Sequence, residues 1–238
     1  MTIEQPIGRV IGLAIVAGVI AGGILAGINL VLVQPYTTLL ADIELENLFA
    51  EGEFDEEEFD AQLQSIYFWQ QYGAIATGLG GGVLVGSAFI AINARRIKTS
   101  SLKAALVIAG IMWFALYVVP AMKYPPSPEV AFNRQAAAVY NPLLIGYTAV
   151  SGLAAAAIAF GFNKVKRKEK AFGAAALYLS VVAAAFFVFP DYENEDDDLL
   201  FPEPVVNAWR SAVSLSMTAF WFSLGAISGA LWTYGSKK

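Results

Sequence analysis

The chain contains no cysteine and no histidine. The absence of cysteine excludes disulfide scaffolds and thiol nucleophiles, and the absence of histidine excludes imidazole general bases. Zinc and haem sites lose their usual ligands for the same reason. The sequence also lacks the Gly-x-x-x-x-Gly-Lys-Ser/Thr loop, so ATP hydrolysis within this chain is excluded. These absences together argue against an enzyme.

Charge is scarce as well. Only 15% of the 238 residues are charged, whereas 57% are hydrophobic and the mean hydropathy is +0.57. This composition is typical of an integral membrane protein. Apolar runs of about 18 residues or more are long enough to span a bilayer as helices. Six such runs cover about 7–33, 66–92, 102–119, 141–162, 171–189 and 205–234.

We therefore predict an all-α integral membrane protein with six transmembrane helices, forming a single membrane domain over 1–238. The first run is too long for the apolar region of a signal peptide, and no small-x-small cleavage site follows it, so we expect it to be retained. Pro142 leaves two options for the fourth span. The helix begins there, where a proline needs no N–H, or Pro142 kinks a longer helix that includes 128–140.

The distribution of charge predicts the orientation. Twelve of the fifteen basic residues fall on one side of the six runs, and eighteen of the twenty acidic residues fall on the other. The positive-inside rule then places both termini in the cytoplasm, and with them a multi-pass protein in the cytoplasmic membrane. The acidic segments 34–65 and 190–204 become outer loops.

Prolines and arginines recur along the chain in a way that indicates an internal repeat. Spans one, three and five each leave the membrane at a proline, namely Pro35, Pro120 and Pro190. Spans four and six are each entered by a proline followed six residues later by an arginine, in Pro128–Arg134 and Pro204–Arg210. Because every hairpin starts on the inside, the sequence predicts three parallel repeats of a helical hairpin.

Glycines spaced by four residues mark the first two spans. They are Gly18 and Gly22 in the first span and Gly78, Gly82 and Gly86 in the second. This spacing puts small residues on one helix face, where two backbones can approach closely. Packing of the two spans on each other is the favoured interpretation. A seam between two copies in a homo-oligomer, or a sliding surface for a moving helix, is the alternative.

Polar residues within the spans give the candidates for transport or gating. Arg134 and Arg210 lie at the outer entries of spans four and six, where they could bind a carboxylate or an anion, or gate a vestibule. Alternatively, they could reach lipid phosphates at the interface. The neutral candidates are Asn29, Gln34, Gln70 and Gln71. These could line a polar path, although hydrogen bonding between helices is the favoured role.

The acidic segments are candidates for weak metal binding. Asp42, Glu44 and Glu46 follow the first span, and a second acidic run begins at Asp191. Neither stretch fits the calcium loop, which requires Gly at position six and Glu at position twelve. Two interpretations remain open: solvated outer loops, or low-affinity capture of divalent cations by oxygen ligands. A protease-like Ser151-Gly152 pair lacks the histidine that would activate the serine.

Several of these elements together resemble a known family. The pattern Pro120…Tyr124-Pro-Pro-Ser-Pro-Glu…Arg134-Gln-Ala, followed by Phe189-Pro190, Pro204-x5-Arg210 and Phe220-Trp221…Gly225, resembles the CbtA family of predicted cobalt transporter subunits. The resemblance implies a subunit for cobalt uptake that serves cobalamin synthesis. It also implies a small one-span partner whose histidine-bearing tail supplies metal selectivity. Cobalt would be the substrate, with no cofactor bound within the chain and no nucleic acid as partner.

A second class of function stays open. No acidic or basic residue falls in the middle of any predicted span, which argues against a carboxylate proton relay. Together with the glycine-rich faces, this is also consistent with a non-transporting accessory or scaffold subunit of a larger membrane complex.

Overall fold

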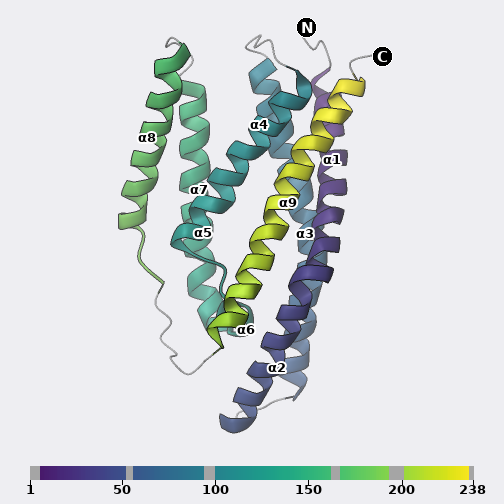
Figure 1. Cartoon of the computed structure of the whole chain (residues 1–238), viewed down its shortest axis with the longest axis vertical. Coiled ribbons are helices and arrows are strands. Elements are labelled where there is room, and N and C mark those ends of the chain that lie inside the picture. Colours follow the sequence, from purple (N-terminus) through teal and green to yellow (C-terminus); the bar gives the residue numbers. More distant parts are fainter. Residues whose placement is uncertain (1–5, 52–55, 94–99, 162–166, 193–200, 236–238) are drawn as a thin grey trace. The chain divides into compact units, whose positions relative to one another are not determined.

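The structure is a computed structural model that describes residues 6–51, 56–93, 100–161, 167–192 and 201–235. All regular elements in these ranges are helical, and Figure 1 shows their arrangement. They are α1 (Ile7–Ile28), the π-helical turn η1 (Asn29–Val33), α2 (Gln34–Glu51), α3 (Glu56–Asn93), α4 (Ser101–Trp113), the π-helical turn η2 (Phe114–Val118), α5 (Val119–Lys123), α6 (Pro128–Phe132), α7 (Arg134–Gly161), α8 (Arg167–Val188) and α9 (Glu203–Gly235).

Five helices in the described ranges are long and apolar enough to cross a membrane. They are Ile7–Phe49, Phe59–Ala91, Ser101–Lys123, Arg134–Ala159 and Glu203–Gly235, and each overlaps one predicted span. The sixth predicted span, 171–189, corresponds to a shorter apolar helix, Phe172–Val188. The all-helical architecture of a multi-pass membrane protein is therefore confirmed, whereas the number of six spans stays a prediction.

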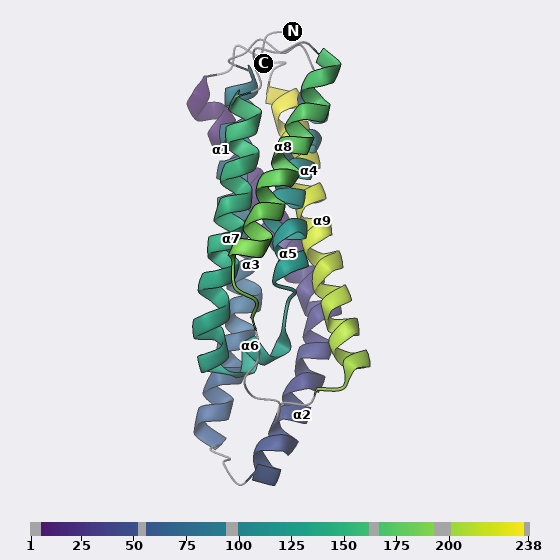
Figure 2. The same cartoon turned by 90° about the vertical axis from the view of Figure 1, so that its left-hand side faces the viewer.

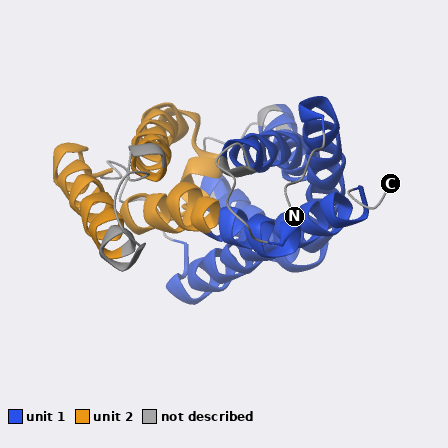
Figure 3. Cartoon of the chain, turned by 90° about the horizontal axis from the view of Figure 1, so that it is seen from above, with its two compact units in different colours: residues 1–110, 199–238 blue, residues 111–198 orange. Residues whose placement is uncertain are grey.

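The chain forms two compact units, coloured separately in Figure 3. Unit 1 comprises residues 1–110 and 199–238, and unit 2 comprises residues 111–198. Unit 1 therefore holds α1, η1, α2, α3, most of α4 and α9. Unit 2 holds η2, α5, α6, α7 and α8.

Unit 1 is built around close contact between α1 and α3. A Cβ atom added to Gly18 would overlap the backbone of Gly78, and one added to Gly22 would come within 2.8 Å of the Ala74 carbonyl oxygen. A Cβ atom added to Gly82 would overlap the Ala14 carbonyl group, and one added to Gly86 would overlap the Ala14 side chain. The five predicted packing glycines thus lie where the two backbones touch, which small residues alone permit.

Helix α9 packs on the same pair of helices. Trp232 donates a hydrogen bond from Nε1 to the Val10 carbonyl oxygen at 3.1 Å and stacks on Phe89 with ring centroids 3.8 Å apart. The Phe220 and Leu224 side chains each come within 3.0 Å of where a Cβ on Gly81 would be. The last turns of α9 therefore lie beside the first turns of α1, at one end of unit 1 (Figure 1).

The helices of spans one and three do not end at Pro35 and Pro120, the prolines at which these spans were predicted to leave the membrane. Both prolines lie inside continuous helical paths, each two residues after a π-helical turn, η1 or η2. A proline has no N–H and its ring clashes with the preceding turn, and a wider π turn relieves both problems. Segment 34–65, predicted as a loop, is helical in its described parts, because α2 runs to Glu51 and α3 starts at Glu56.

The helix that contains the fourth predicted span begins earlier than 141. Asn133 separates α6 from α7, and its Oδ1 accepts hydrogen bonds from the backbone N–H groups of Gln135 and Ala136, both at 2.9 Å. This N-cap starts α7 at Arg134. Pro142 consequently lies inside α7, as in the second of the two sequence options, but the longer helix includes 134–140 and not 128–133.

Candidate functional site

A hydrogen-bonded polar cluster joins four segments of unit 1. Its members are Asn29 at the start of η1, Thr37 on α2, Gln70 on α3, and Trp209 and Ser216 on α9. Asn29 Nδ2 donates to the Gln70 carbonyl oxygen at 3.3 Å, and Ser216 Oγ donates to Asn29 Oδ1. Thr37 Oγ1 accepts from Gln70 Nε2 at 2.8 Å and from Trp209 Nε1 at 3.2 Å, and donates to the Val33 carbonyl oxygen at 3.2 Å.

The polar cluster satisfies its own members. Thr37 is 2% exposed, and its hydroxyl uses both acceptor positions within the cluster and its donor on the Val33 carbonyl oxygen. Both polar ends of the Asn29 amide are bonded as well. This arrangement favours hydrogen bonding between helices over a polar path through Asn29 and Gln70. Gln34 and Gln71, the other two neutral candidates, lie on α2 and α3 and are not members of the cluster.

A polar stripe runs along another face of α9. An open cavity of about 620 Å³ is lined by Asn207, Arg210, Ser211, Ser214, Leu215 and Thr218. The spacing of three and four residues puts them on one side of the helix. Ser211 and Thr218 donate to carbonyl oxygens of their own helix, on Asn207 and Ser214, both at 2.7 Å. Arg210 is partly buried and brings a permanent positive charge to this stripe.

The two arginines of the predicted repeat occupy different positions in their helices. Arg134 is exposed and is the first residue of α7, whereas Arg210 lies two turns inside α9. Arg134 belongs to unit 2 and Arg210 to unit 1. Asn133 interrupts the helix between Pro128 and Arg134, but α9 continues from Pro204 through Arg210. Their matched spacing in the sequence therefore does not become matched local structure.

Among the three predicted metal-binding carboxylates, only one is buried. Glu44 is 5% exposed, whereas Asp42 and Glu46, two residues before and after it on α2, are exposed. Within the described residues, no group of three or more Asp and Glu side chains could hold a metal ion. The second acidic run lies mostly in 193–200, outside the described residues.

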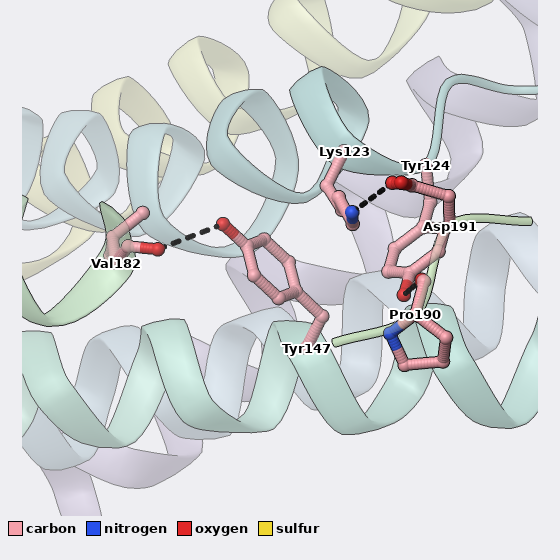
Figure 4. A network of polar contacts seen from close by, with 6 residues as sticks. All are labelled: Lys123, Tyr124, Tyr147, Val182, Pro190 and Asp191. Carbon is pink, nitrogen blue, oxygen red and sulfur yellow. Dashed lines mark hydrogen bonds and ion pairs between the residues drawn. The ribbon is translucent and has the colours of Figure 1, made fainter. Parts of the chain in front are cut away.

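Unit 2 contains an ion pair that the sequence analysis did not single out (Figure 4). The Lys123 ammonium, on a side chain that is only 3% exposed, pairs with the Asp191 carboxylate, which is 79% exposed. Lys123 Nζ also lies 4.5 Å from the centroid of the Phe186 ring. A buried charge requires a partner. Lys123 is the single lysine on the acidic side of the sequence, and this feature could have been used to predict the ion pair.

Tyrosines surround this ion pair and connect α5, α7 and the end of α8. Burial raises the pKa of Tyr124, whose hydroxyl donates to the Pro190 carbonyl oxygen at 2.6 Å. The Tyr140 hydroxyl lies 2.8 and 2.6 Å from the carbonyl oxygens of Tyr124 and Pro125, which share its single proton. Tyr147 donates to the Val182 carbonyl oxygen at 3.3 Å. The segment that leaves α8 at Pro190 is therefore held at the end of α5 by the Tyr124 hydroxyl and the ion pair, whereas Tyr140 and Tyr147 tie α7 to the end of α5 and to α8.

Ser151 stabilises the π turn η2. In η2 the Val119 N–H bonds to the Phe114 carbonyl oxygen, five residues back, so the next carbonyl, on Ala115, would bond residue 120. Pro120 has no N–H to offer. Ser151 Oγ lies 2.6 Å from the Ala115 carbonyl oxygen and donates to it, and lies 2.7 Å from the Tyr178 hydroxyl.

These features define a class of protein: a multi-pass, all-helical membrane protein whose polar side chains are grouped inside its helical units. The CbtA family, described as probable cobalt transporter subunit, has a sequence model that matches residues 7–233. The chain belongs to this family. No curated protein and no solved structure matches the chain.

Proposed function

We propose that this chain is the membrane subunit of an uptake system for a divalent transition metal, cobalt, and that it works with a small histidine-bearing one-span partner. It would lie in the cytoplasmic membrane with six spans and both termini inside. Membership of the CbtA family over residues 7–233 is the observation that carries this proposal.

The chemistry of the chain supports a partner that selects the metal. Selective sites for cobalt and its neighbours normally use imidazole or thiolate ligands, and this sequence has neither histidine nor cysteine. Carboxylates such as exposed Asp42 and Glu46 would raise the local concentration of cations without selecting among them. Selectivity would therefore come from the histidine-bearing partner.

The polar stripe of α9 is the better candidate for the ion route within unit 1. The polar cluster around Thr37 bonds to itself, and glycine contacts close the seam between α1 and α3. The stripe instead borders an open cavity of about 620 Å³. Arg210 would act there as a gate, because its positive charge repels a cation until a carboxylate or the partner neutralises it.

The experiment is accumulation of labelled cobalt in cells that express the chain alone or with the candidate partner. Nickel and manganese serve as competitors, and membrane levels of the protein are measured in parallel. The proposal expects saturable uptake that becomes selective for cobalt only when the partner is present. Background uptake with both proteins in the membrane would contradict it.

A scaffold subunit is the second candidate, and the closed packing of unit 1 favours it. The glycine seam and the self-satisfied polar cluster are features that a non-conducting support would also have. Under this alternative, transport would depend on the presence of the chain but would be insensitive to changes in the polar stripe.

Arg210→Ala distinguishes the two candidates. We expect this variant to lose saturable, selective cobalt accumulation at unchanged protein level, because the charge that would gate the polar stripe is removed. Arg134→Ala is the parallel variant for unit 2, and Ser180→Ala, an exposed position bonded to its own helix at the Ala176 carbonyl oxygen, is the control. Normal uptake by the Arg210→Ala variant would remove Arg210 from the mechanism and favour the scaffold.

A further inference from the structure

Two helical paths of unit 1 are much longer than a membrane is thick. Helix α3 has 38 residues, and the helical path Ile7–Phe49 has 43. At 1.5 Å per residue these lengths are about 57 and 65 Å. The hydrocarbon core of a bilayer is about 30 Å thick, or 40–45 Å with its headgroups. A substantial part of each helix must therefore lie outside the membrane.

An exposed aromatic patch on α3 marks one position where the membrane could end. Phe68, Trp69 and Tyr72 are 50%, 64% and 57% exposed. Phe68 stacks on Tyr72 with centroids 4.5 Å apart and meets Trp69 edge-on at 5.4 Å. Tryptophan and tyrosine concentrate at membrane–water interfaces, where an apolar ring body and a polar tip are both satisfied.

Neighbouring helices carry aromatic residues at the same level. Gln70, within the patch, bonds Thr37, and Thr37 also accepts from Trp209 on α9. Tyr67, one residue before the patch, shares a hydrogen bond with Thr38 at 2.9 Å. The aromatic patch on α3, the start of α2 and Trp209 on α9 are therefore at a common level in unit 1.

Helix lengths measured from this level agree with one bilayer thickness. On α3, Trp69 lies 24 residues before the last residue, Asn93, and the intervening helix is about 36 Å long. On α9, Trp209 lies 25 residues before Tyr234, which is 73% exposed, and the intervening helix is about 38 Å long. Both lengths fall between the hydrocarbon and the full bilayer thickness.

We propose that lipid headgroups contact the aromatic patch Phe68, Trp69 and Tyr72, and that the rest of the α2–α3 pair stands in water as an extramembrane helical hairpin. The hairpin comprises 38–51 of α2 and 56–67 of α3. Each arm has a length of about 20 Å. Figures 1 and 2 show α2 and the start of α3 extending beyond the N-terminal end of α9, also in unit 1.

The assignment of this hairpin to the outer side rests on the proposed function, but the membrane boundary does not. The hairpin carries exposed Asp42 and Glu46, five and nine residues beyond Thr37, so it would present carboxylates to cations about 8 and 14 Å outside the membrane boundary. A second protein seated on the aromatic patch is the competing occupant, and the experiments below separate it from lipid.

The first experiment exploits the absence of cysteine in the chain. Single cysteines replace Asp42 and Glu46 in the hairpin, and Ile75 and Val83 on α3 beyond the aromatic patch. All four side chains are exposed in the structure, so burial within unit 1 does not distinguish them. A membrane-impermeant maleimide is applied to intact cells and to inverted vesicles, with denatured protein as the reference for full labelling.

We expect labelling at 42 and 46 in intact cells and protection at 75 and 83 from both sides until the membrane is dissolved. Labelling at 42 and 46 only in inverted vesicles would support the boundary while contradicting the orientation in the proposed function. Labelling at 75 and 83 as fast as at 42 and 46 would overturn the boundary.

The second experiment tests lipid as the occupant of the aromatic patch. The chain and its Trp69→Phe variant are reconstituted in vesicles whose lipids are brominated near the headgroup end of the acyl chain. Lipid at the patch predicts that the quenched fraction of tryptophan fluorescence falls in the variant, because exposed Trp69 is its source. Equal quenched fractions in the two proteins would show that lipid does not contact the patch and would overturn the proposal.

Discussion

At the scale of single residues, Lys123 depends on Asp191. The ammonium is held in a side chain that is 3% exposed, beside the Phe186 ring, and its carboxylate partner is the first residue after Pro190. Asp191 is therefore committed to a structural ion pair and is not a free member of the acidic run that follows it.

Replacing each partner of this pair should have unequal effects. Asp191→Asn leaves a buried ammonium without its counter-charge, and we expect a loss of about 2 kcal/mol in the free energy of unfolding, since Asp191 itself is largely exposed. Lys123→Met keeps the apolar stem without the charge and should cost less, about 1 kcal/mol. Denaturation in detergent micelles measures both. A larger loss for Lys123→Met than for Asp191→Asn would contradict this account of the pair.

Ser151 offers a second test at this scale. Ser151→Ala leaves the Ala115 carbonyl without a donor and Tyr178 without its partner. We expect a loss of about 1–2 kcal/mol in the stability of unit 2. Ser180→Ala, an exposed serine bonded to its own helix, should change stability by less than about 0.5 kcal/mol. Thermal unfolding of the two variants compares them, and equal effects would be inconsistent with the role assigned to Ser151.

At the scale of helices, each proline of η1–α2 and η2–α5 is coupled to the π turn before it. The Pro120→Ala substitution supplies an N–H that can bond the Ala115 carbonyl oxygen, the atom that Ser151 now serves. Ser151→Ala should therefore cost about 1 kcal/mol less in a Pro120→Ala background than in the natural chain. A double-mutant cycle of unfolding free energies measures this coupling, and additive effects would refute it.

The seam between α1 and α3 gives another test at the helix scale. Gly78→Ala places a methyl group against the Gly18 carbonyl and within 3 Å of the Gly22 backbone, so the helices must separate. We expect it to destabilise the protein by about 1–3 kcal/mol. Gly80→Ala, two residues along α3 with nothing within 4 Å, should be neutral or slightly stabilising through helix propensity. Unfolding midpoints of the two variants decide the matter, and similar values would argue against close contact at Gly78.

At the scale of the whole molecule, composition and apolar runs were enough to predict the helical membrane architecture, because bilayer thickness fixes the length of a spanning segment. The same reasoning gave no indication that the helices continue past Pro35 and Pro120. A proline does signal a helix end in isolation, but a π turn upstream and neighbouring helices can absorb it. Segment 34–51 has few apolar residues at regular spacing, so the sequence did not predict that the helical path of the first span continues through it.

The site residues were only partly accessible from the sequence. Asn29 and Gln70 attracted attention as polar residues within spans, but their common partner Thr37 lies beyond the predicted exit at Pro35 and was passed over. Ser216 and Trp209 come from the far end of the chain, and tertiary packing alone brings them to the cluster. The roles of Lys123 and the tyrosines of unit 2 were not predicted, because they depend on burial, which the sequence does not show.

The central claim is that this chain conducts cobalt while its partner selects it. Purified chain, alone and with the histidine-bearing partner, is reconstituted into vesicles that contain a cobalt-sensitive dye, and the initial rate of cobalt entry is measured against nickel and manganese. The account predicts entry above empty vesicles when the chain is present, with preference for cobalt appearing only with the partner. Cobalt entry through the partner alone, unchanged by this chain, would contradict it.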